Sequence, residues 1–91
     1  MKLYNLTVCV ESDTGFAKTE ILTQQPEEAV LDCLLSYGTL TEPVAERLVL
    51  WGKELRALPC STKFAAGLPG GGRMVVVGSE RSPHQLALDE G

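Results

Sequence analysis

The sequence contains few of the residues that metal sites, disulfide frameworks and aromatic binding platforms need. Of its 91 residues, one is a histidine, three are cysteines and 5% are aromatic. The odd number and wide spacing of Cys9, Cys33 and Cys60 argue against a disulfide framework. They also argue against structural zinc, whose ligands come in pairs roughly two to four residues apart. Since His84 is the only further soft ligand, we expect no metal and no other cofactor.

Long hydrophobic runs and an excess of basic residues are also missing. No apolar stretch approaches the ~18 residues of a membrane-spanning helix. Asn5 and Thr7 interrupt the N-terminal apolar stretch, which disfavours a signal peptide, so we expect a cytoplasmic protein without membrane contact. The 8 Lys and Arg residues against 12 Asp and Glu residues give a net charge of −4. Direct nucleic-acid binding is disfavoured, because the phosphate backbone requires a basic face.

What is present is an ordinary globular composition, with 44% hydrophobic and 22% charged residues. In a chain of this length such a composition predicts one domain, residues 1–91, with a single modest core.

The N-terminal quarter of the chain predicts a β-hairpin. Residues 3–11 and 16–23 alternate in polarity, and Ser12-Asp13-Thr14-Gly15 between them is typical of a turn. A slip of one residue would scatter the apolar side chains over both faces, so the pattern favours one register. The predicted pairs are Glu11–Phe16, Val10–Ala17, Val8–Thr19, Leu6–Ile21 and Tyr4–Thr23.

Two helices are predicted next. Pro26 suits the first position of a helix that Gly38 would end, and Thr41 suits the N-cap of a second helix that ends before Pro59. Gly52 interrupts the second helix and could kink or shorten it. Apolar residues at helical spacing form one stripe on each helix: Val30, Cys33, Leu34 and Tyr37 on the first, and Val44, Leu48, Trp51, Leu55 and Leu58 on the second.

The C-terminal third predicts a loop and one more strand. Residues 59–72 are rich in small residues, Pro and Gly, and 67–72 reads as a flexible Gly-rich loop. Residues 74–77 are apolar on both faces, which is typical of a covered strand. Residues 83–88 have a helix-start pattern, and 89–91 should fray. The expected fold is therefore a two-layer α+β domain of order ββααβ, with its helices on one face of a three-stranded, mainly antiparallel sheet.

Two motifs leave alternative functions open. Gly67 and Gly72 have the spacing of a phosphate-binding loop, and Cys60 with His84 as base would supply a thiol enzyme. However, Arg73-Met74 replaces the Lys-Ser/Thr of a phosphate loop, and a strand follows instead of a helix. We therefore expect no catalytic residue and keep a thiol-dependent enzyme or ligand-binding protein as an alternative. The second alternative is a nucleic-acid-binding regulator, whose basic surface would consist of Arg47, Lys53, Arg56 and Arg73.

Apolar residues outside the predicted core favour a protein-binding surface. A helix cannot turn four consecutive side chains inward, so Leu50 lies outside the stripe of the second helix, and Phe16 falls on the polar face of the hairpin. The acidic excess is local to Glu27, Glu28 and Asp32, which suits a basic partner. These five residues are the predicted partner-binding set.

In size, acidity and layout the chain is similar to small inhibitors of phages and mobile elements, anti-CRISPR proteins among them. This likeness is general and involves no particular residues. Together with the apolar excess it predicts a non-catalytic protein-binding module, a small intracellular inhibitor or accessory subunit. The expected partner is a protein, either a basic or nucleic-acid-binding complex or a second copy of the chain.

Overall fold

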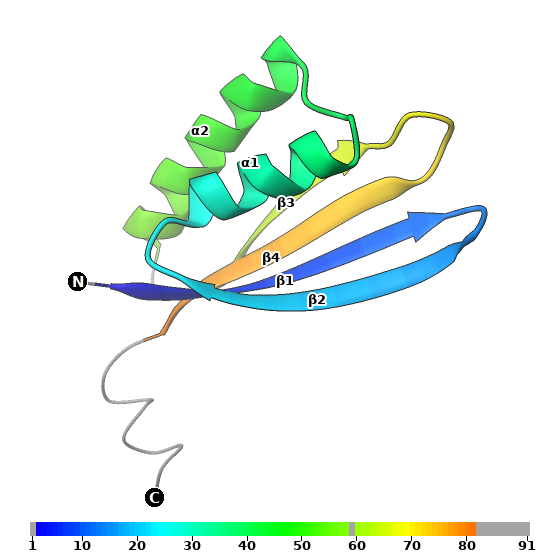
Figure 1. The fold of residues 1–91 in the computed structure, drawn as a ribbon. Helices are drawn as coiled ribbons and strands as arrows, with labels where there is room; N and C mark the ends of the chain where they lie inside the picture. Colours follow the sequence, from blue (N-terminus) through cyan, green and yellow to red (C-terminus); the bar gives the residue numbers. More distant parts are fainter. Residues whose placement is uncertain (1, 59, 82–91) are drawn as a thin grey trace, which may run out of the picture.

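The computed structural model describes residues 2–58 and 60–81. Its elements are β1 (Leu3–Ser12), β2 (Gly15–Thr23), α1 (Pro26–Ser36), α2 (Glu42–Ala57), β3 (Thr62–Gly67) and β4 (Arg73–Arg81). The strands form one antiparallel sheet of order β2-β1-β4-β3. Both helices lie on the same face of this sheet (Figure 1). The predicted α+β class is confirmed.

The β1–β2 hairpin has the predicted register. Glu11 pairs with Phe16, Val8 with Thr19, and the remaining pairs follow to the end of the hairpin. Four alternating residues of β1 are buried beneath the helices: Tyr4, Leu6, Val8 and Val10. The alternation that predicted the hairpin therefore also decides which face of the sheet the helices cover.

The helix ends are also where the capping residues predict them. Pro26 is the first residue of α1, and Gly38 just after its end has the positive φ of +66° that such a position favours. The Thr41 hydroxyl accepts a hydrogen bond from the Val44 N–H at 3.4 Å and caps α2. The helix runs through Gly52 to Ala57. Leu58 lies outside the stripe, since it is the C-cap residue and 37% exposed.

The predicted three-stranded ββααβ order is wrong in its strand count, because a fourth strand lies inside the predicted loop 59–72. That strand is β3, and its last residue, Gly67, was assigned to the Gly-rich loop. Phe64 and Ala66 are buried in β3 while Lys63 and Ala65 are exposed, as expected of an edge strand with one covered face. The order is therefore ββααββ.

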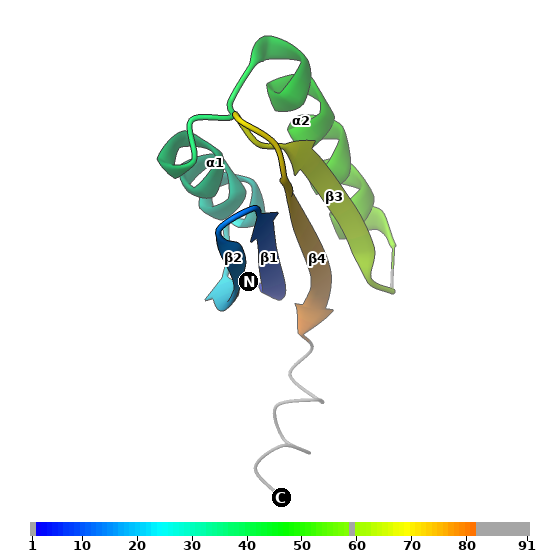
Figure 2. The same cartoon turned by 90° about the vertical axis from the view of Figure 1, so that its right-hand side faces the viewer.

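The strand predicted at 74–77 is β4, which is longer and lies between β1 and β3. Residues 68–72 connect β3 to β4 in a hairpin, where the Leu68 N–H donates to the Gly72 carbonyl at 3.2 Å. The Thr39 hydroxyl donates to the Gly67 carbonyl. This bond ties the α1–α2 connection to the end of β3, and the two segments lie side by side in Figure 2.

The core fills the space between the helices and the sheet. Trp51 of α2 packs on Phe64 of β3, with ring centroids 6.0 Å apart. The buried apolar residues are Tyr4, Leu6, Val8, Val10, Val30, Leu34, Leu48, Trp51, Leu55, Phe64, Ala66, Met74 and Val76. The predictions for 83–88 and 89–91 lie outside the described residues.

Candidate functional site

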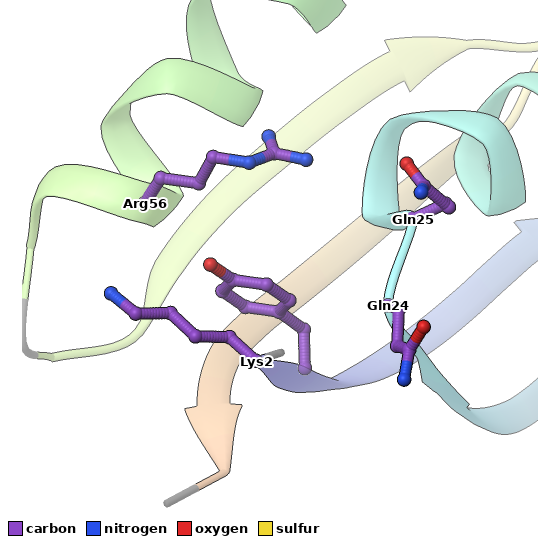
Figure 3. A pocket seen from close by; sticks show the side chains of 5 residues that line it. Lys2, Gln24, Gln25 and Arg56 are labelled. Carbon is purple, nitrogen blue, oxygen red and sulfur yellow. The ribbon is translucent and has the colours of Figure 1, made fainter.

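One pocket opens beside the start of β1. It has a volume of about 340 Å³ and is lined by Lys2, Tyr4, Gln24, Gln25 and Arg56 (Figure 3). The Arg56 guanidinium lies over the Tyr4 ring, 5.8 Å from its centroid. Lys2 forms an ion pair with Glu80 at 3.6 Å. The cations of this pocket are thus engaged within the chain.

Arg56, which lines this pocket, also forms an ion pair between α2 and α1. Arg56 donates to the Glu27 carboxylate and, at 3.2 Å, to the Gly52 carbonyl. A Cβ atom on residue 52 would overlap the Glu27 side chain. Gly52 does not end α2, which continues to Ala57. It provides the clearance that lets Glu27 lie against the helix and reach Arg56.

This pairing shifts the ionisation of both groups. Burial opposes the ionisation of Glu27, but the hydrogen bond and charge of Arg56, with a backbone hydrogen bond, outweigh it and hold its pKa below the ordinary value. The hydrogen bond from Arg56 to Glu27 raises the pKa of the guanidinium. Glu27 is therefore a structural carboxylate in its ionised form.

We expect Glu27→Gln to reduce the acid sensitivity of the fold. A carboxyl whose pKa is lowered by folding stabilises the protein above its ordinary pKa of ~4.3, and this contribution is lost as the pH falls through the lower folded pKa. The ion pair is partly exposed, so its contribution at pH 7 should be about 0.2–1 kcal/mol. The free energies of unfolding of wild type and variant should differ at pH 7 and converge as the pH falls below the lowered folded pKa of Glu27.

Urea titrations across this pH range measure the effect, and Glu28→Gln on the exposed side of α1 is the matched control. Equal pH dependence in wild type and Glu27→Gln would contradict the assignment. A Glu28→Gln variant with the larger change would contradict it as well.

A second depression lies between α2 and the edge strand β3. Its volume is about 330 Å³, and Arg47, Leu50, Trp51, Glu54, Lys63, Phe64 and Ala65 line it. The Arg47 guanidinium lies 5.4 Å from the centroid of the Phe64 ring and donates to the Ala65 carbonyl. Leu50 is 64% exposed. We call this depression the α2–β3 groove.

The α2–β3 groove combines an aromatic floor with charged sides. Arg47, Leu50 and Glu54 have the i, i+3, i+7 spacing of one helix face, and Lys63 at the edge of β3 also lines the depression. Such a surface can hold an apolar side chain while the charges select its flanks. Sequence reasoning found Leu50 but missed the groove, because β3 was read as a loop. The alternation around Phe64 was the available signal.

The five predicted partner-binding residues do not form one surface. Glu28 and Asp32 are exposed on α1, whereas Glu27 is half-buried beside Arg56. Leu50 lies at the groove beside β3. Phe16 lies on β2, at the opposite edge of the sheet, and its place in the register puts it on the face away from the helices.

The predicted basic set is also dispersed. Arg47 binds the β3 backbone, Arg56 pairs with Glu27, and Arg73 contacts Glu11 at 3.3 Å. Arg47 and Arg56 are nine residues apart in α2, a spacing that puts them on opposite sides of a helix. The structure therefore does not bring Arg47, Arg56 and Arg73 together; Lys53, three residues before Arg56, is on the same side of α2 as Arg56.

The predicted cysteine and glycine motifs do not form a site in the part of the chain that the structure describes. All three cysteines are free; Cys60 is exposed and its proposed base, His84, lies outside the described residues. Burial, followed by the charge of Asp32, raises the pKa of the Cys33 thiol. The Gly67–Gly72 segment leads from strand to strand. Among residues 2–58 and 60–81, no group of three or more His, Cys, Asp or Glu side chains is placed to hold a metal ion.

Neither α1 nor α2, the helices of the described ranges, has the length and apolar character to cross a membrane. Comparison with protein-family models, with curated proteins and with solved structures gives no match.

Proposed function

We propose that this protein is a non-catalytic protein-binding module, an inhibitor or accessory subunit that acts through the α2–β3 groove. The observation that carries this proposal is the placement of exposed Leu50 beside a groove floored by Trp51 and Phe64. Aromatic and Arg side chains are enriched in the centres of protein interfaces, and apolar anchors there dominate the binding energy.

The charges around the groove suggest how a partner would be oriented. Arg47 and Lys63 favour an acidic flank on the bound segment. Glu28 and Asp32, exposed on α1, would attract the basic regions of a larger partner. In this proposal the acidic residues act on the rate of association, and Leu50 acts on the lifetime of the complex.

Leu50→Asp should abolish capture of the partner from a lysate of the source cells without changing the fold. The substitution removes an apolar anchor and puts a carboxylate into a contact that must lose water. Leu35→Asp is the matched control, because Leu35 is a similarly exposed leucine on α1. Quantitative comparison of the proteins captured by wild type and the two variants is the measurement.

With the captured partner purified, Leu50→Ala should raise the dissociation rate by about 10- to 100-fold. Reversal of Glu28 and Asp32 to Lys should slow association and reduce its salt dependence. A partner retained by Leu50→Asp but lost by Leu35→Asp would move the site to α1 and overturn the proposal.

A further inference from the structure

Strand β2 forms one edge of the sheet and is largely exposed. Residues 15–20 are all exposed, and so is Leu22. No proline and no bulge interrupts β2, since its pairs with β1 are continuous from Tyr4–Thr23 to Ser12–Gly15. An edge strand of this length without these devices is a template for pairing with another strand.

The two edges of the sheet differ in this respect. The other edge strand, β3, has six residues, and the Arg47 side chain bonds its Ala65 carbonyl. β2 has nine residues. The edge with the longer run of unpaired backbone is therefore β2.

The register identifies the backbone groups of β2 that face outward. The Ala65 carbonyl points away from β4, since Arg47 reaches it from outside. Ala65 pairs with Val75, Val75 with Cys9, and Cys9 with Lys18. In an antiparallel sheet the N–H and C=O groups of one residue both point to the same neighbouring strand. Ala65 and Val75 are therefore a non-hydrogen-bonded pair, Val75 and Cys9 a hydrogen-bonded pair, and Cys9 and Lys18 again a non-hydrogen-bonded pair. The N–H and C=O groups of Lys18 thus point away from β1. The same holds for every second residue of β2: Phe16, Glu20 and Leu22.

The sequence of β2 is complementary to itself in one antiparallel register. With Thr19 on a two-fold axis, Lys18 faces Glu20 of the partner subunit, and Phe16 faces Leu22 of the partner subunit. Both contacts occur twice by symmetry. Phe16 and Leu22 are 64% and 50% exposed in the single chain, so the pairing would cover both.

Neighbouring registers are unfavourable. Residues whose N–H and C=O groups point away from β1 must pair with residues of the same kind in the partner strand. The two-fold axis must therefore pass through a residue of β2 and not between two residues, so the neighbouring registers have their axes at Lys18 and at Glu20. An axis at Lys18 puts the two Lys18 side chains opposite each other, and an axis at Glu20 does the same for the carboxylates. Like charges directly opposite destabilise a strand pair. The charge pattern thus selects the register centred at Thr19.

We propose that the chain forms a symmetric homodimer in which β2 pairs antiparallel with β2 of a second copy, centred at Thr19. The two four-stranded sheets join into one continuous sheet. Paired backbone groups hold the strands together, and the Lys18–Glu20 contacts fix the register. This surface is separate from the α2–β3 groove, which lies at the other edge of the sheet.

Charge reversal tests the register. Lys18→Glu and Glu20→Lys should each raise the dimer dissociation constant about tenfold or more, because two attractive contacts become repulsive. The double variant Lys18→Glu/Glu20→Lys should dimerise like wild type. An equimolar mixture of the two single variants should form a heterodimer, since every carboxylate then faces a lysine. Sedimentation velocity over a range of concentrations measures all four.

The intramolecular neighbours of these residues on β1 are Cys9 and Thr7, so none of the variants breaks an ion pair within the chain. A wild type that remains monomeric at millimolar concentration would overturn the proposal. The proposal would also be overturned if the single charge reversals left the dimer dissociation constant unchanged. The same holds if the two single variants, mixed in equal amounts, formed no heterodimer.

A crosslink locates the axis independently. In a Cys60→Ser background, Thr19→Cys should give a disulfide-linked dimer on oxidation, because residues opposite each other in a non-bonded pair have Cα atoms about 4.5 Å apart. Ala17→Cys is the control, since residue 17 faces residue 21 of the partner and has no thiol opposite it. Faster crosslinking of Ala17→Cys than of Thr19→Cys would exclude this register.

Discussion

Leu48→Asp should unfold the protein at 25 °C. Leu48 is 4% exposed and belongs to the core between α2 and the sheet. Removing its side chain leaves a cavity that costs about 2–5 kcal/mol. The carboxylate must in addition either lose its water without a partner or expose the core. Since domains of this size are stable by only about 5–15 kcal/mol, the sum should exceed the available stability.

Leu50→Asp is the matched control for Leu48→Asp. It makes the same chemical change two residues further along the same helix, at a side chain that is exposed. Its melting temperature should stay within a few degrees of wild type, whereas Leu48→Asp should show no cooperative transition by circular dichroism. A Leu48→Asp variant that melts like wild type would contradict the assignment of the buried face of α2.

The parts of the fold that could be predicted are those where one local pattern fixes the structure. The register of β1 and β2 follows from alternating polarity, because a slip of one residue would expose the apolar set. The helix ends follow from Pro26, Gly38 and Thr41, whose preferences depend only on residues close to them in the chain. In these segments local preference and tertiary packing agree.

β3 could not be predicted because its residues show only a weak alternation of polar and apolar side chains. Ala65, Ala66 and Gly67 bury small areas, so their alternation gives a weak signal, and Phe64 is the one large apolar side chain in the strand. The strand is stabilised instead by pairing with β4 and by packing under Trp51. These contacts depend on distant parts of the chain, which the local sequence does not encode.

The candidate site was predicted only in part for the same reason. Leu50 could be singled out because a helix has a limited buried arc. The groove beside it depends on β3. The sequence placed Glu27 in the partner-binding set, whereas its contact with Arg56 depends on the close approach of α1 to Gly52. A glutamate that only stabilises the start of a helix and a glutamate that pairs with an arginine of another helix cannot be told apart in the sequence.

The glycine segment, read from the sequence as a flexible connector, contains a residue that is required sterically. Gly72 has a φ of +86°, and a Cβ atom there would overlap the Glu11 carbonyl and lie 3.0 Å from the Ser12 Cα. These are backbone atoms at the end of β1, so they cannot move without disturbing the hairpin. The β3–β4 connection thus contacts the β1–β2 turn through a position that only glycine fits.

Gly72→Ala should therefore lower the free energy of unfolding by about 2–4 kcal/mol, which combines the cost of a left-handed conformation with that of displaced backbone. Gly70→Ala is the matched control, because Gly70 has a similar φ of +80° but no atom within 4 Å of the added carbon. It should cost about 1 kcal/mol, the conformational part alone. Urea unfolding of both variants separates the two contributions. Equal losses in the two variants would show that the contact with β1 carries no energy, and that conformation alone explains glycine at position 72.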